Sequence, residues 1–267
     1  MDATQERLTT GWEPDVPVED TLVRRYLFHN VQLCSAFAYA GGGHALETPD
    51  VGMADLGRPS PRAAAAAWPR SSSRWDAVLD EIERFYAGGH GEAMLWSAWP
   101  TPDLRRRGWR LSGHPPLLFR PPALIVPPPA GAPAAVVRVT DAAELAEWER
   151  VAVEGYPMPE LVPVRPGAMA APVLLGDDRL AFWLGHDDGR AVSAAASFAS
   201  HGIASFALGV TRPEVRRRGH WQALAAARLA AHPDVWVAGV FSDLSRSGAE
   251  AIGFVPVQRL TLWILDR

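Results

Sequence analysis

The sequence predicts an α/β or α+β protein in which helices flank a mixed sheet. Short apolar runs with strand character alternate with longer segments whose apolar residues recur at helical spacing. In the second half of the chain, from residue 135, the predicted order is β-α-β-β-β-α-β-α-β. Helices that alternate with strands cover the faces of a sheet, so a layered fold is expected.

The first half predicts two helices and a strand. Apolar residues recur at helical spacing over residues 18–40, and again over 74–89, where glycines end the pattern. The run "EAMLWSAW" (92–99) predicts a strand. Residues 41–73 are rich in turn-forming residues, which predicts an irregular surface segment.

The second half begins with a predicted strand, "AVVRV", and a helix from Asp141, which has Glu144 three residues later as in a capping box. Three strand-like runs follow, and Asp188-Gly189 marks a hairpin between the first two. The remaining elements are a helix supplied by "GVTRPEVRRRGHWQALAAARLAAH" (209–232), the strand "VWVAGVF", a short helix within "SDLSRSGAEAIGF" and the strand "VQRLTLWIL".

A proline-rich segment, "RPPALIVPPPAGAP" (120–133), separates the two halves. Proline can neither continue a helix nor donate to a sheet, so an extended connector is expected. We therefore expect an N-terminal α/β domain over residues 1–120, a linker over 121–134 and a second domain over 135–267. A weak internal similarity between residues 93–119 and 235–265 has two readings, coincidence or a degenerate second copy of one unit.

Composition excludes several classes of function. The net charge of −4 opposes non-specific binding of nucleic acid. All 26 basic residues are arginine, which indicates a GC-rich, bacterial genome and removes lysine as a nucleophile.

The single cysteine, Cys34, excludes an intrachain disulfide, and no histidine pair has metal-ligand spacing, so no metal is expected. The polar N-terminus is not a signal peptide and no run is long enough to span a membrane, which predicts a cytoplasmic protein.

The stretch "GVTRPEVRRRGHW" (209–221) predicts an anion site. It joins a strand to a helix, and the first N–H groups of a helix have no internal acceptor. Gly219 allows a bound group to approach the backbone, and Arg216 to Arg218 add positive charge. A phosphate or diphosphate fits such a place. The alternative is a solvated run of arginines at the start of a helix.

Residues 136–267 resemble a GCN5-related N-acetyltransferase (GNAT) domain. Arg216 and Gly219 match the family motif [QR]-x-x-G-x-[GA], and Ile252-Gly253-Phe254 matches a later family signature. The resemblance implies a splayed sheet that binds acetyl-CoA between two parallel strands and transfers its acyl group directly to an amine. It assigns donor binding to these residues: Leu208, Val210, Arg216, Arg217, Arg218, Gly219, His220, Trp221 and Ser242.

The chain also departs from the family pattern. Trp221 stands where the motif has Gly or Ala, so the ring must turn away from the phosphates. Arg217 replaces a usual glycine, and Ala249 replaces the tyrosine that protonates the departing thiolate in similar enzymes. Ser245 or Ser247 are the candidates to replace that tyrosine through a water molecule.

Candidates on the acceptor side lie in "EGYPMPEL" (154–161). Glu154 and Glu160 are possible bases or amine anchors and Tyr156 a possible wall; alternatively, these are solvated carboxylates at a helix end. His201 and His220 are further candidate bases.

Three functions therefore compete. The first is transfer of an acetyl or other acyl group from acetyl-CoA to a small-molecule amine. The second keeps the fold but takes the acyl group from a carrier protein or an aminoacyl-tRNA, and the third is a catalytically degenerate CoA-binding protein. A monomer or homodimer without membrane association is expected.

Overall fold

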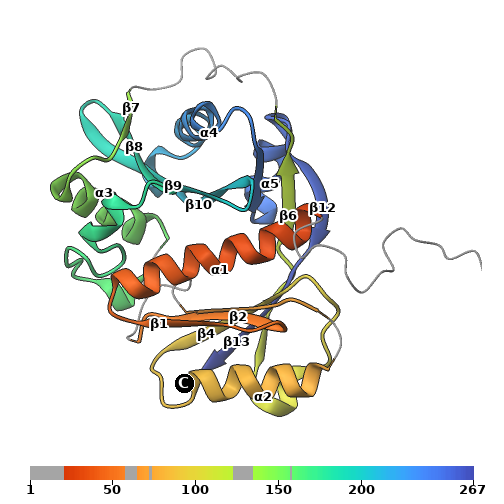
Figure 1. Ribbon diagram of the computed structural model, residues 1–267. Coiled ribbons are helices and arrows are strands. Elements are labelled where there is room, and N and C mark those ends of the chain that lie inside the picture. Colours follow the sequence, from red (N-terminus) through yellow and green to blue (C-terminus); the bar gives the residue numbers. More distant parts are fainter. Residues whose placement is uncertain (1–20, 58–64, 72–73, 123–134, 157) are drawn as a thin grey trace, which may run out of the picture.

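The computed structural model describes residues 21–57, 65–71, 74–122, 135–156 and 158–267, and it contains two sheets stacked with helices between and outside them (Figure 1). Its helices are α1 (Leu22–Ala40), α2 (Trp75–Tyr86), α3 (Ala142–Gly155), α4 (His220–Ala231) and α5 (Asp243–Ala251). Four short 3-10 turns are η1 (Leu104–Arg107), η2 (Pro159–Leu161), η3 (Pro172–Gly176) and η4 (Pro213–Val215). The α+β class predicted from the sequence is confirmed.

Both sheets are mixed. The six-stranded sheet has the spatial order β1 (His44–Glu47), β2 (Val51–Asp55), β3 (Ala65–Pro69), β4 (Glu92–Ser97), β13 (Thr261–Asp266) and β5 (Arg110–Gly113). The seven-stranded sheet has the order β12 (Val255–Arg259), β6 (Pro116–Arg120), β11 (Trp236–Val240), β10 (Ile203–Thr211), β9 (Arg190–Ser200), β8 (Leu180–Asp187) and β7 (Val136–Arg138). In each sheet one pair of neighbours is parallel, β3 with β4 and β10 with β11.

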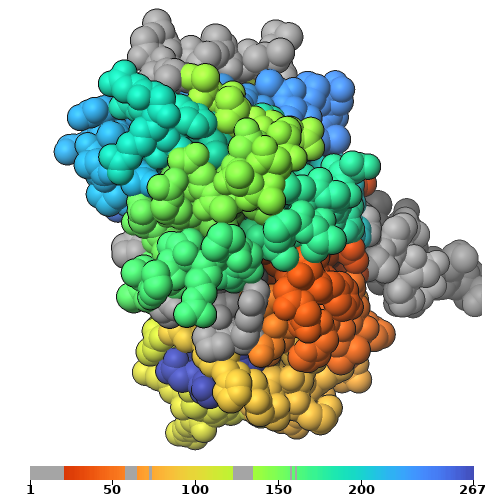
Figure 2. All heavy atoms as spheres, turned by 90° about the vertical axis from the view of Figure 1, so that its left-hand side faces the viewer, coloured from red at the N-terminus to blue at the C-terminus, as the bar shows by residue number. Residues whose placement is uncertain are grey.

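The helix α1 lies between the two sheets and packs against both (Figure 1). Its residues Tyr26 and Leu27 join a core cluster between the sheets, and Phe37 joins the cluster under α3. The helix α2 covers the outer face of the six-stranded sheet, and α4 covers the outer face of the other. The chain from α3 to η3 covers one side of the molecule next to α1 (Figure 2).

The prediction that residues 41–73 form an irregular surface segment is wrong for the residues that the structure describes. It forms β1, β2 and β3, and every residue of β2 and β3 is buried. A strand buried on both faces shows no alternation of apolar and polar residues. In β2 and β3 the glycine, alanine and proline residues also have low strand propensity, so neither signal of a strand was present. The other predicted helices and strands are present, including the hairpin at Asp188-Gly189, where both residues have positive φ. The single last strand predicted from "VQRLTLWIL" (257–265) is wrong, because the chain divides at Leu260 into β12 and β13, which belong to different sheets. A continuous run of strand-forming residues gives no sign of a change of sheet.

The two halves exchange a strand. Each half ends in a pair of strands, β5 with β6 and β12 with β13, and the second strand of each pair enters the other sheet. There β6 lies between β11 and β12, and β13 lies between β4 and β5. A buried ion pair between Arg267 and Asp55 holds the end of β13.

The sheets therefore do not divide at one point in the chain. The predicted domain limits at residues 120 and 135 stay a prediction, and residues 123–134 of the linker lie outside the described residues. The segment β4-η1-β5-β6 occupies the same place in one half as β11-α5-β12-β13 does in the other. This equivalence favours two copies of one unit over a coincidence.

Candidate functional site

The parallel strands β10 and β11 separate before they end. They pair only from Ile203 to Phe206 on β10, opposite Trp236 to Gly239 on β11. Beyond Phe206, β10 continues to Thr211 without a partner on this side. The unpaired N–H and C=O groups at this edge are available to a ligand that offers complementary amide groups.

A bulge in β10 lies at the start of the unpaired edge. The register with β9 shifts between Ala207 and Val210, and Leu208 there has a φ of 49°. A non-glycine residue rarely adopts this left-handed conformation, and such strain persists only where the surroundings enforce it. The Tyr156 hydroxyl contributes to that enforcement, because it donates a 2.7 Å hydrogen bond to the carbonyl oxygen of Gly209.

The end of α3 approaches the bulge closely because Gly155 has no side chain. A Cβ at that position would lie 2.1 Å from a methyl carbon of Val210. The loop after β10 is tied to the same helix end, since the Arg216 guanidinium donates to the carbonyl oxygens of Thr211 and Gly155, each at 3.1 Å. The bulge, the end of α3 and the loop therefore form one packed unit.

The N-terminus of α4 faces the open end of the two strands and has no capping side chain. Its N-cap is Gly219, with a φ of 91°, and Arg217 in the preceding loop has a φ of 65°. No backbone N–H from Arg217 to Gln222 donates to an acceptor within the described chain. Side chains cap α1, α3 and α5, whereas α2 resembles α4 in having no capping side chain.

These free donors are the main chemical feature of the site. They point from a helix start, where the dipole adds partial positive charge, and no acidic residue stands in the first turn of α4. Arg216, Arg217 and Arg218 are exposed beside them, and Arg218 lies 3.7 Å from Asp187. The arrangement suits a phosphate or diphosphate.

The Trp221 indole does not stand over the exposed loop. Its ring centroid is 6.4 Å from that of Phe241, and a Cβ on Gly248 of α5 would lie 3.3 Å from the indole. The ring thus packs between α4 and α5. The ring therefore points away from the loop, as predicted from the sequence for a motif that has tryptophan in place of Gly or Ala.

His220, the first residue of α4, is buried, and its Nε2 has no hydrogen-bond partner in the described chain. Burial lowers its pKa, and Asp187, 3.8 Å away, only partly opposes this effect. His201 lies in the turn before β10, at the opposite end of the strand from the bulge, and stacks on Phe28. The structure therefore brings His220 to the site and leaves His201 away from it.

The carboxylates predicted for catalysis have other roles or no described position. Glu154 forms an ion pair of 2.5 Å with Arg212, whose side chain is buried. The side chain of Glu160 lies outside the described residues. Glu149, which the sequence analysis did not select, is buried and accepts hydrogen bonds from the N–H groups of Gly167, Met169 and Ala170, so it holds the loop beyond α3 in place.

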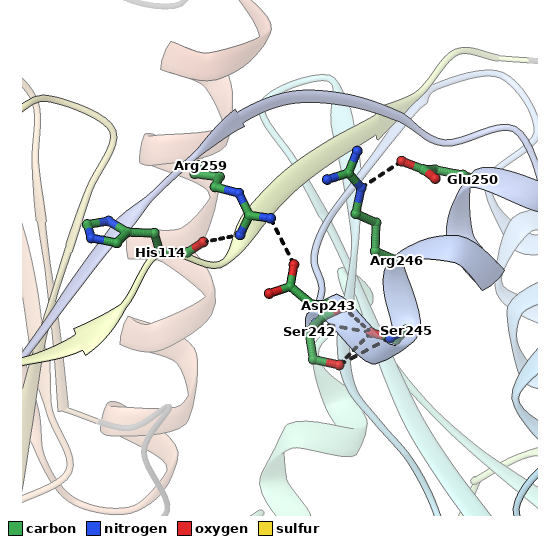
Figure 3. Close-up of polar contacts among 7 residues, drawn as sticks. All are labelled: His114, Ser242, Asp243, Ser245, Arg246, Glu250 and Arg259. Atoms are coloured by element: carbon green, nitrogen blue, oxygen red, sulfur yellow. Dashed lines mark hydrogen bonds and ion pairs between the residues drawn. The ribbon is translucent and has the colours of Figure 1, made fainter.

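Ser242 and Ser245 cap the start of α5 (Figure 3). The Ser245 hydroxyl bonds to the backbone N–H and carbonyl of Ser242, and the Ser242 hydroxyl accepts from the N–H of Ser245. Arg259 of β12 joins this turn to the β5–β6 connection, through Asp243 at 2.8 Å and the His114 carbonyl at 2.6 Å (Figure 3). Ala249 is fully buried, so α5 places no proton donor there.

Sequence reasoning missed Arg228 of α4. Its side chain is buried beneath β10, and its spacing of four residues from the buried Leu224 was the available signal. Within the described residues no group of acidic, histidine or cysteine side chains suits a metal ion. Among those same residues, no helix has the length and apolarity to cross a membrane.

No family model matches this sequence, and no match was found among curated proteins. Solved structures with a similar fold include a GNAT-family protein from Novosphingobium aromaticivorans DSM 12444, with 17% identity, 90% of this chain and 98% of the other covered, and a TM-score of 0.54. A GCN5-related N-acetyltransferase from Kribbella flavida has 18% identity, coverage of 88% and 94%, and a TM-score of 0.56. A tandem GNAT protein from the clavulanic acid biosynthesis pathway has 16% identity, coverage of 78% and 75%, and a TM-score of 0.50.

Proposed function

The chain has the GNAT fold, and we propose that it is an acyltransferase that moves an acyl group from acetyl-CoA, or a related acyl-CoA, to the amine of a small molecule. The observation that carries this proposal is the uncapped start of α4 beside the separated strands. The free N–H groups from Arg217 to Gln222 match a diphosphate. The unpaired edge of β10 beyond Phe206 matches the amides of a pantetheine arm.

The proposed reaction is direct transfer. The amine nitrogen attacks the thioester carbonyl, a C–N bond forms, the C–S bond breaks, and the nitrogen loses a proton to a base or to water. The donor residues proposed from the sequence keep that role: Leu208, Val210, Arg216, Arg217, Arg218, Gly219, His220, Trp221 and Ser242. A backbone N–H near the bulge would polarise the thioester carbonyl.

Two of the candidates for base and acid already have partners within the described chain. Glu154 and Glu160 remain proposed bases or amine anchors, although the Glu154 carboxylate already forms an ion pair with Arg212. Ser245 remains a proposed proton donor, although its hydrogen bonds belong to the cap of α5. Replacement of Glu154 by Gln lowers turnover if this carboxylate serves the acceptor.

CoA binding tests the proposal. Isothermal titration with CoA and acetyl-CoA should give saturable binding, and ligand at about 100 times Kd should stabilise the fold by about 2.7 kcal/mol. Gly219→Val should weaken binding at least about tenfold, because a branched side chain strains a positive φ and shifts the N–H groups.

Gly88→Val is the matched control. Gly88 also has a positive φ, of 78°, but it lies after α2, away from the site, in open space. This variant should bind CoA like the wild type. Absence of both heat and stabilisation with either ligand in the wild-type protein would refute the proposal.

A second candidate is a CoA-binding protein without catalysis. The engaged Glu154, the capping role of Ser245 and the buried Ala249 favour it. A panel of small primary amines distinguishes the two: free thiol released from acetyl-CoA supports the transferase, and tight CoA binding without turnover supports the non-catalytic protein. A carrier-protein or aminoacyl-tRNA donor would instead show binding that weakens steeply with salt.

A further inference from the structure

Arg228 is a fully enclosed arginine at the candidate site. Its exposed fraction is 1%, and its guanidinium lies between α4 and β10, with Cζ 3.7 Å from the centre of the Phe206 ring. Its Nε donates to the Leu224 carbonyl at 3.2 Å and Nη1 to the Ala196 carbonyl at 3.4 Å. A Cβ on Gly209 of the bulge would lie 3.6 Å from both terminal nitrogens, so the guanidinium adjoins the bulged backbone.

The charge of Arg228 has no negative partner in the described chain, where no carboxylate lies within ion-pair distance of it. Two other arginines with buried side chains have carboxylate partners: Arg212 pairs with Glu154 and Arg267 with Asp55. Burial lowers the pKa of Arg228 to about 9. A buried charge without a partner is costly, and such costs are retained where function requires them.

The field of this charge reaches the opposite side of the bulge. Desolvation of the Tyr156 hydroxyl raises its pKa, although 42% of the residue is exposed, and the charge of Arg228 opposes that rise. The Tyr156 hydroxyl lies on the α3 side, 2.7 Å from the Gly209 oxygen, whereas Arg228 lies on the α4 side. The groups around the guanidinium are thus a neutral phenol from α3, backbone carbonyls from β9 and α4, and the aromatic ring of Phe206.

We propose that Arg228 stabilises the negative charge that develops on the sulfur of the donor when its thioester is cleaved. This inference rests on the proposed function. The amine forms the C–N bond, the C–S bond breaks, and its electron pair stays on sulfur as a thiolate. The amine proton goes to a base or to water, and the guanidinium supplies charge without giving up a proton. Ala249 cannot donate a proton, and the Ser245 hydroxyl is engaged in the cap of α5, so charge stabilisation by Arg228 takes the place of protonation of the leaving group.

The test compares two ligands that differ only at sulfur: CoA, whose thiol ionises, and its S-ethyl thioether, which cannot. Both are titrated calorimetrically into the full chain between pH 6 and pH 8, where Arg228 stays charged. In the wild type, the affinity for CoA relative to the thioether should rise at least about threefold over this range. That rise corresponds to a lowering of a thiol pKa from about 8.5 by about one unit.

Three variants make the comparison specific. Arg228→Met should abolish the rise, and Arg228→Lys should retain part of it. Arg106→Met, which removes an exposed arginine of η1, should behave like the wild type.

Each outcome decides the matter. A constant ratio in a wild type that binds both ligands overturns the inference and leaves the proposed function intact, and an undiminished rise in Arg228→Met overturns it as well. Failure of the wild type to bind either ligand removes the proposed function and the inference together. If Arg228→Met does not fold, Arg228→Gln replaces it in the same comparison.

Discussion

The two parallel strand pairs of this protein share a topology and differ at the point where the strands part. In the six-stranded sheet, β3 and β4 pair at Ala66 with Met94 and Ala67 with Leu95. The next residues, Trp68 and Trp96, stack with ring centroids 5.5 Å apart and an interplanar angle of 8°. In the seven-stranded sheet the corresponding residues, one beyond the last pair, are Ala207 and Val240.

The helices that follow β3 and β10 also differ, in how well their N-termini suit an anion. The helix α2 has Arg74 at its N-cap and Asp76 in its first turn, which disfavours an anion. Arg74 and the nearby Arg70 are already paired with Asp50 and Glu47. The helix α4 has a glycine N-cap and no acid in its first turn. Both helix starts lack a capping side chain, so the copies differ in the acid of the first turn and in the stacked indoles: one copy is closed and the other is open.

The largest expected effect comes from opening the closed copy. Trp68→Ala removes a buried indole that contacts Trp96 and Tyr26, and we expect a loss of about 3–5 kcal/mol in the free energy of unfolding. Urea denaturation measures this loss. Calorimetry should still find one CoA site per chain, because Asp76 and the paired arginines remain. A second CoA site would mean that the stacked indoles alone close this half.

Closing the open copy should give the next largest effect. Ala207→Trp places an indole where β10 leaves β11, as Trp68 does beside β4, and we expect CoA affinity to fall about a hundredfold or more, about 2.7 kcal/mol. Calorimetry measures the affinity. A melting curve verifies the fold, since overpacking also destabilises. A folded variant that binds CoA like the wild type would contradict the assignment of the open edge.

The smallest expected effect concerns exposed charge. Arg217→Ala should weaken CoA binding by about threefold at low salt and by less at high salt, because exposed charges are screened. Arg105→Ala, in the arginine run of η1, is the matched control and should leave binding unchanged. An equal effect of both substitutions would mean that the arginines act through net charge, not through the loop.

The predictions that succeeded depended on local patterns. The Asp-Gly hairpin at residue 188, the Asp141 cap of α3 and the Gly219 turn before α4 each involve residues close in sequence. The strands β2 and β3 were missed because strands buried on both faces leave no alternation to detect. Arg228 was missed because its spacing from Leu224 is a weak signal in an alanine-rich helix, where arginine is ordinarily exposed.

The sequence by itself determined the class of fold, the order of the elements in the second half up to the last predicted strand, and the glycine turn before α4, because steric limits and hydrogen bonding act over a few residues. Tertiary structure decided the exchange of β6 and β13, the stacking of Trp68 on Trp96 and the enclosure of Arg228. Each of these joins residues far apart in the chain. Such contacts depend on which surfaces bury each other in the folded molecule, and that selection is made by packing of the whole chain.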